Sequence, residues 1–223
     1  MDASAVDGLQ SLAASPTPAA VKLFLLVTAM SFVSAVLLCM TSFTRIIIVL
    51  GLMRQALGTP QTPPNQVLIG LALFLTAFVM APTATRVHAE AWTPWAEDRM
   101  PTPEAVDRAS GIVKAFMLAQ TDAEDIRLFY DLSRRARPAR GEDIPMTVAA
   151  PAFLLSELQT AFRMGLHLLV PMLLIDLLVS SILLSLGMMM VPPALLSLPL
   201  KLAVFALADG WRLLVSSLVR SFV

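Results

Sequence analysis

Several ionisable side chains lie in or beside apolar runs, where a charge is costly and therefore informative. An ionised group at the centre of a membrane helix costs about 2.5–3.5 kcal/mol on insertion scales. Asp176 is the clearest case, because it lies in the middle of the apolar run 166–186. It needs a partner, a water-filled lumen or a neutralising proton, so it could relay protons or ions or make a structural contact at a subunit interface. The complete set of buried polar or interface candidates is Arg45, Arg54, Glu157, Arg163, Asp176, Lys201 and Asp209.

The chain offers little support for enzyme chemistry. Its two histidines, His88 and His167, are far apart, and a lone histidine in an apolar run is more often a satisfied core residue. No metal-ligand spacing, phosphate-binding loop or nucleophile elbow occurs in the sequence. A net charge of zero and a pI of about 6.7 give no support for a nucleic-acid partner. We therefore expect no enzyme, no cofactor and no metal.

Residues 187–193, which read GMMMVPP, join two apolar runs. Consecutive prolines cannot continue a helix, and glycine lowers the cost of an irregular backbone. Methionine is unbranched and soft, so it can repack around whatever touches it. The pattern predicts an adaptable apolar loop at a helix break, as a deformable seal requires. The candidate sealing residues are Met188, Met189 and Met190.

The composition is that of a membrane protein, with 57% hydrophobic residues, 14% charged residues and a mean hydropathy of +0.76. Soluble domains carry about 25% charged residues. Residues 83–147 hold eleven of the 16 acidic and nine of the 16 basic residues. The chain therefore divides into a polar N-terminal segment (1–20), a first hydrophobic helical hairpin (21–82), a polar helical insert (83–148), and a second hairpin with an amphipathic C-terminal helix (149–223).

Both hydrophobic blocks follow the plan of helix, Gly/Pro-Pro break and shorter helix. The expected breaks are Gly58, Pro63 and Pro64 in the first block, and Gly187, Pro192 and Pro193 in the second. Before the first break, residues 23–44 suffice to cross a membrane, since about 20 residues do so. After it, residues 67–81 are short for that purpose. Paired broken segments in two halves of a membrane protein point to a functional site near the breaks.

Two short amphipathic helices are expected in the insert. One starts at Thr102-Pro103, because proline favours the first helical position, and the other opens after Thr121. The apolar face of the second is Ile126, Phe129, Tyr130 and Leu132, and in the C-terminal helix Trp211, Leu214, Val215 and Leu218 share one face. The insert is either a small subdomain packed against a neighbour or a solvated connection.

Long sequence motifs carry a resemblance to a known family. Residues 41–50 read TSFTRIIIVL, 56–60 ALGTP, 63–68 PPNQVL, 70–76 GLALFLT and 79–82 VMAP. In the second block, SEL, TAF, IDL, GMMMVPP and DGW occur at 156–158, 160–162, 175–177, 187–193 and 209–211, and FML and QT stand in the insert. These motifs closely resemble the FliP/SctR family of type III export-gate subunits, over roughly residues 32–222.

The resemblance implies an all-α membrane protein that assembles into a helical oligomeric channel. It implies a flagellar export gate in the bacterial inner membrane, multi-pass and within the basal body, built from five copies of the chain with FliQ and FliR and working with FlhB and FlhA. Unfolded flagellar proteins would be the substrates, and lipid would surround the assembly. It implies that the insert is periplasmic and that Met188–Met190 narrow the closed channel. The family usually has an N-terminal signal peptide, whereas residues 1–18 are polar and acidic and do not resemble one, so we expect that this chain either begins after that peptide or lacks it.

Two alternatives remain at this point. The chain could be the related injectisome subunit, although residues 59–66 read TPQTPPNQ, which looks flagellar. From a different class, it could be a small secondary transporter or ion channel that uses Asp176. A membrane enzyme is the least favoured hypothesis, because the sequence contains no group of titratable residues that would form a catalytic site.

Overall fold

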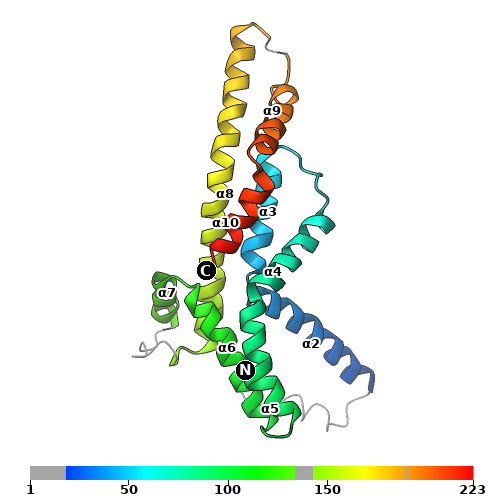
Figure 1. Ribbon diagram of the computed structural model, residues 1–223, viewed down its shortest axis with the longest axis vertical. Coiled ribbons are helices and arrows are strands. Elements are labelled where there is room, and N and C mark those ends of the chain that lie inside the picture. The colour runs from blue at the N-terminus through cyan, green and yellow to red at the C-terminus, as the bar shows by residue number, and fades with distance from the viewer. Residues whose placement is uncertain (1–18, 134–142, 189, 223) are drawn as a thin grey trace. The chain divides into compact units, whose positions relative to one another are not determined.

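The computed structural model describes residues 19–133, 143–188 and 190–222, and this part of the chain is helical without a strand (Figure 1). Most of the predicted N-terminal segment 1–20 therefore lies outside the described residues, which begin at Ala19, the first residue of a helix. Met189 also lies outside them. The elements are α2 (Ala19–Cys39), α3 (Phe43–Ala56), α4 (Asn65–Val87), the π-helix η1 (His88–Trp92), α5 (Thr93–Ala96), α6 (Thr102–Ala119), α7 (Ala123–Ser133), α8 (Met146–Ser185), α9 (Ala194–Leu207) and α10 (Gly210–Arg220).

Packing divides the chain into two compact units. The first unit comprises the described residues of 1–41 together with 80–156, and the second comprises 42–79 and 157–223. The first unit thus holds α2, the insert helices and the start of α8. The second holds α3, most of α4, the rest of α8, and α9 and α10. The four-segment division by hydropathy stays a prediction, because it follows composition rather than packing.

Two helical segments of the described chain are long and apolar enough to cross a membrane, Asn65–Ala96 and Met146–Ser185. Helices α9 and α10, which bend by 64° at their junction, form a third candidate if they act as one span. At about 1.5 Å per residue, the 40 residues of α8 extend about 60 Å, twice the hydrocarbon core. Residues of α8 beyond one bilayer core must lie in the headgroup region, in water or against protein.

The expectation of a short run after the first break was wrong. Pro82 lies inside α4, which continues to Val87 and then through η1 and α5, so the helical segment is 32 residues long. Proline is tolerated in apolar helices where local adjustments satisfy the freed backbone groups. The helix therefore continues past Pro82 and past Arg86, the first charged residue after the apolar run, as far as Ala96.

The predicted span 23–44 is divided by a turn. Helix α2 ends at Cys39, and α3 begins at Phe43. The Thr41 hydroxyl donates to the Leu38 carbonyl at 2.8 Å, and its backbone N–H donates to the same oxygen. Threonine side chains compete in this way with the helical ladder, which is why a polar Thr-Ser step ends an otherwise apolar helix.

The second unit has its core on one face of α3. Ile46, Val49, Leu50 and Met53 are fully buried at helical spacing, against partners from α4, α8, α9 and α10. The predicted apolar face of α10 is half right, because Leu214 and Leu218 are buried whereas Trp211 is exposed. The Trp211 ring instead packs edge-on against Phe205, with ring centroids 5.7 Å apart. Further partners in this core are Leu57, Leu68, Ala72, Ala161, Phe205, Leu214 and Leu218.

The insert helices of the first unit begin where the sequence predicts. Helix α6 starts at Thr102 with proline in its first turn, and α7 starts at Ala123. Ile126 and Tyr130 of α7 form a core with Ile144 and the first residues of α8. Leu132, which the sequence assigns to the same apolar face, is 68% exposed and takes no part in this core, because six residues after Ile126 it lies about 120° away around the helix.

Candidate functional site

Helix α8 ends at the methionine loop in a backbone arrangement that requires glycine. Gly187 has a φ of +73°, the left-handed region that favours glycine. Its N–H donates to the Leu184 carbonyl, and the Met188 N–H donates to the Leu183 carbonyl, both at 3.0 Å. This pair of bonds is a Schellman motif, which satisfies the last carbonyls of the helix. Pro192 and Pro193 then precede α9.

The end of α3 repeats this arrangement. Gly58 has a φ of +76°, its N–H donates to the Gln55 carbonyl at 3.0 Å, and the Thr59 N–H donates to the Arg54 carbonyl at 3.4 Å. Pro63 and Pro64 immediately precede α4. Both breaks thus use a left-handed glycine to end one helix and a proline pair to delay the next.

Arg54, predicted as a buried polar or interface residue, spans the first break. Its guanidinium donates to the Pro63 carbonyl at 3.2 Å and to Asn65 Oδ1 at 2.6 Å. The arginine therefore ties the last turn of α3 to the first residue of α4 and fixes the path of the intervening loop. This role within one chain needs no second subunit.

The thioethers of the second break are exposed on the single chain. Met190 is 97% exposed and Met188 is 44% exposed, while Met189 lies outside the described residues. Near the loop, Val179 and Leu183 of α8 and Ser197 of α9 are buried. The leucines around them face outward. Met188 and Met190 therefore present exposed apolar surface between α8 and α9.

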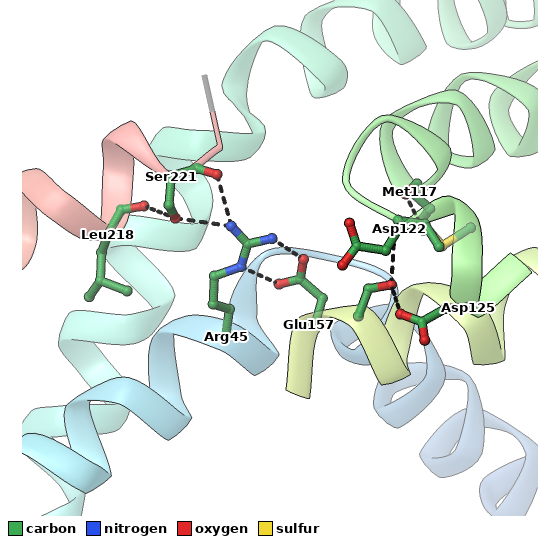
Figure 2. A network of polar contacts seen from close by, with 9 residues as sticks. Arg45, Met117, Asp122, Asp125, Glu157, Leu218 and Ser221 are labelled. Atoms are coloured by element: carbon green, nitrogen blue, oxygen red, sulfur yellow. Dashed lines mark hydrogen bonds and ion pairs between the residues drawn. The ribbon is translucent and has the colours of Figure 1, made fainter. Parts of the chain in front are cut away.

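A buried ion pair joins α3 to α8 in the second unit (Figure 2). Arg45 is 2% exposed and Glu157 is fully buried. The guanidinium donates through both Nε, at 2.9 Å, and Nη2 to the two carboxylate oxygens, which is the bidentate geometry of strong arginine pairs. Its remaining amine donates to the Ser221 carbonyl at 2.9 Å and hydroxyl at 3.0 Å, and the Phe222 ring centroid lies 3.9 Å from the guanidinium carbon.

A second ion pair joins α9 to α8 and α3. Lys201 is 5% exposed, and its ammonium donates to Asp176 Oδ2 at 2.6 Å. The same ammonium donates to the Ala56 carbonyl at 3.2 Å. Ala56 is the last residue of α3, whose final carbonyls lack helical partners and carry partial negative charge. Lys201 therefore neutralises Asp176 and caps α3 at once.

The other two predicted residues do not join these clusters. Arg163 is exposed on α8. Asp209 is exposed at the junction of α9 and α10, where it has a φ of +50° and precedes the first residue of α10. A Cβ at the neighbouring Gly210 would lie 2.3 Å from ring atoms of Phe205, so the bend requires glycine beside Asp209.

Sequence reasoning missed several polar contacts. The carbonyls of Ser221 and Ala56 are backbone oxygens, which residue type does not reveal, and Ser221 adds its hydroxyl. In the first unit, the Ser156 hydroxyl donates to Asp125 and accepts from the Asp122 N–H at 3.0 Å, so that it fixes the start of α7 (Figure 2). The sequence signal that could have indicated this contact was the polar Ser156 in the SEL motif. Among the described residues, no His, Cys, Asp and Glu side chains are grouped so that they could hold a metal ion.

Comparison with known proteins places this chain among close relatives. The model of the FliP family matches residues 26–218. The flagellar biosynthetic protein FliP of Pectobacterium carotovorum is 52% identical over 91% of this chain and 78% of its own length. The protein of that name from Caulobacter vibrioides is 49% identical over 100% of this chain and 84% of its own, and that from Bacillus subtilis is 48% identical over 91% of each.

Proposed function

This chain belongs to the FliP family, and we propose that it is a core subunit of the flagellar type III protein-export gate in the bacterial inner membrane. Its relatives carry the name flagellar biosynthetic protein, and its apolar helices suit a membrane subunit. The chain would act as a structural and gating component without catalysis. It would lie in the basal body as a multi-pass protein.

Assembly with other subunits follows from what a single chain leaves uncovered. In the hairpin of α8 and α9, Leu177, Leu178, Ile182 and Leu184 are each more than half exposed, as is Leu195. Exposed apolar patches usually mark surfaces that contact protein or membrane, and α8 is longer than one bilayer core. We infer that copies of this chain, as a pentamer, pack with FliQ and FliR into a cone-like channel, with FlhB and FlhA as further partners. Unfolded flagellar proteins would pass through it.

The observation that carries the gating proposal is the exposed methionine loop on its glycine-terminated helix. Gly187 and the prolines fix where the loop leaves α8 and enters α9, whereas the exposed thioethers of Met188 and Met190 belong to flexible side chains that can repack. Loops from neighbouring copies would meet on the channel axis, close around one another when idle, and part around varied polypeptides. Flexible apolar side chains suit this task because it requires no specific fit.

A triple substitution tests the seal. Met188, Met189 and Met190 are replaced together by alanine, and leakage of small solutes is measured in cells that assemble the gate. Met30→Ala is the matched control, because this methionine is also mostly exposed but lies on α2. We expect leakage only in the triple variant. A closed state unchanged by the triple substitution would remove the loop from the gate.

The alternatives receive less support. Asp176 is engaged by Lys201, which leaves it poorly suited to relay ions in this state, and solute flux by the purified chain without partners would be needed to revive that hypothesis. These relatives carry the flagellar name, which favours the flagellum over an injectisome. The position of the gene among flagellar or virulence genes distinguishes these two.

A further inference from the structure

The outward face of α10 carries an open hollow of about 590 Å³ whose walls are mainly apolar. Leu214 and Leu218, on the inner side of the helix, are buried in the core of the second unit. Trp211, Val215 and Val219 follow one another at every fourth residue, so they form a single apolar stripe along the hollow. The other residues that line it are Arg212, Ser216 and Arg220.

The two arginines of the hollow indicate the chemistry of its partner. Both are exposed, and in the part of the chain that the structure describes neither forms an ion pair. Their positions, 212 and 220, lie about 12 Å apart along the helix. Because interfaces match opposite charges across them, α10 suits a partner helix with an apolar stripe beside two acidic residues at a similar spacing.

Helix α7 of this chain carries such a face. Its inner side lies in the core of the first unit, whereas Leu128 and Leu132 on its outer side are 43% and 68% exposed. Glu124 and Asp131 are exposed beside these leucines, about 10.5 Å apart along the helix, and neither forms an ion pair among the described residues. Arg127, also exposed, lies beyond the acids on the side away from the leucines. The outer face of α7 therefore matches the α10 hollow in apolar content, charge and spacing.

The handedness of the α-helix fixes how the two faces meet. Viewed from the N-terminus, successive residues turn clockwise by about 100°. Arg212 and Arg220 therefore lie clockwise of the apolar stripe on α10, whereas the acids of α7 lie anticlockwise of its leucines. If the helices are parallel, the charged edges of the two faces fall on the same side of the contact. If they are antiparallel, the charged edges fall on opposite sides, so the charges select parallel packing.

Helix α10 ends beside the part of α8 that leads out of the insert. Ser221, which follows α10, accepts a hydrogen bond from Arg45, and Arg45 pairs with Glu157 of α8 (Figure 2). Along α8, Glu157 is about 17 Å from the first residue, Met146, and about 42 Å from the last, Ser185. Equivalent parts of neighbouring copies in a ring lie at the same level. The insert of a neighbour is therefore closer to this level than its methionine loop.

We propose that the outer face of α7 in one copy packs in parallel against the α10 hollow of the next copy. Glu124 then faces Arg212, and Asp131 faces Arg220. Two different faces of the chain meet in this contact, and such head-to-tail contacts generate a ring when the rotation closes. The inference rests on the proposed function, which supplies several copies around one axis, and it names a surface through which they join.

A disulfide between two differently tagged copies tests the contact. Both copies are expressed together with their partner subunits, and the exposed Cys39 is replaced by serine in each. One copy carries Leu128→Cys and the other Val215→Cys, and a mild oxidant is added to the detergent-extracted complex. Only a disulfide that joins the two tags is scored, which excludes contacts within one chain. Leu213→Cys replaces Val215→Cys in the matched control, because Leu213 is also exposed on α10 but lies outside the hollow.

Charge reversal tests the pairing of the acids with the arginines. Arg212→Glu together with Arg220→Glu should lower the yield of the disulfide about tenfold, because like charges then face one another. Adding Glu124→Arg and Asp131→Arg to both copies should restore the yield. Arg163→Glu, on an exposed position of α8, is the matched control and should leave it unchanged. All the reversed side chains are exposed, so these variants keep both cores intact.

We expect the disulfide with Val215→Cys to exceed that with Leu213→Cys severalfold. Equal yields from the two positions, or a charge-swapped protein that regains nothing, would overturn the proposal. A disulfide from α10 to a different subunit in place of α7 would do the same. If the two tags purify together without this disulfide, only the α7–α10 contact is wrong. If the tags never purify together, the assembly of copies in the proposed function is wrong as well.

Discussion

The buried pair between Arg45 and Glu157 gives the sharpest test of what holds the second unit together. Replacing Glu157 by glutamine preserves the shape of the side chain but leaves a nearly inaccessible guanidinium without an anion. Breaking a buried ion pair from one side costs about 3–5 kcal/mol, because the remaining charge is uncompensated. The Ser221 oxygens and the Phe222 ring still contact Arg45, so we expect the low end, about 3 kcal/mol.

This loss converts into a measurable melting temperature. Chains of 150–250 residues lose about 2–4 °C per kcal/mol, so Glu157→Gln should lower the Tm of the purified assembly by about 6–12 °C. Thermal unfolding of the detergent-extracted complex, followed by tryptophan fluorescence, is the assay. Glu90→Gln is the matched control, because Glu90 forms an exposed pair with Arg86, and such pairs contribute about 0–1 kcal/mol.

A double substitution separates the charge from the packing. Arg45→Met combined with Glu157→Leu removes both charges, and apolar replacement of a buried pair is often neutral or stabilising by about 1–4 kcal/mol. The double variant should therefore melt above Glu157→Gln. A Glu157→Gln protein that melts within about 2 °C of the unaltered one, or a double variant less stable than the single, would refute the argument that burial makes this pair essential.

Three further outcomes follow from local geometry. Lys201→Met removes the donor to Asp176 and to the Ala56 carbonyl and should lower the free energy of unfolding by about 1.5–3 kcal/mol, measured by thermal unfolding. An unchanged Tm would mean that these contacts do not stabilise the fold. Gly165→Ala puts a methyl group 2.3 Å from Leu52 Cδ1 and should destabilise the fold by about 1–3 kcal/mol. Gly70→Ala meets nothing within 4 Å and should stabilise it by up to about 1 kcal/mol. Equal melting temperatures of the two variants would contradict the close packing at Gly165. Gly187→Ala imposes a left-handed backbone on an L residue at about 1–2 kcal/mol; faster amide hydrogen exchange at the end of α8 would reveal it, and Gly187→Asn should show a smaller effect.

The sequence predicts those features that depend on local chemistry. The helix ends at Gly58 and Gly187 can be predicted because glycine favours the left-handed backbone and the prolines that follow cannot continue a helix. The start of α6 at Thr102 is legible for the same reason. The length of α4 is not, because proline inside an apolar helix is decided by whether neighbouring groups absorb the lost hydrogen bond. Pro82 looks like a stop in the sequence and acts as an interior residue in the fold.

Pairing of charges is the part that sequence alone leaves open. Arg45 and Glu157 are separated by 112 positions, and either could have been assigned to several other partners. Asp176 could equally be read as a proton carrier until Lys201 is found beside it. Long-range contacts depend on how helices pack, which residue type at a single position does not encode. A costly charge in an apolar run indicates that a partner or solvent access is needed, and only the fold shows which: Arg45 and Lys201 have partners, whereas Arg163 and Asp209 are exposed.

The pair of Lys201 and Asp176 also bears on where the proposed seal can lie. A slip of one turn between α8 and α9 would shift them by about 5.4 Å, separate the ammonium from the carboxylate and leave Asp176 without its partner and the Ala56 carbonyl without its cap. Lys201 is buried and Asp176 partly exposed, and setting register is the best-attested use of ion pairs held inside a fold. The pair therefore fixes how far the hairpin extends, and with it the position of Met190, while the methionine side chains stay free to repack. A seal of the kind proposed, which opens repeatedly at one level of a channel, would need both properties, and here they would come from different residues.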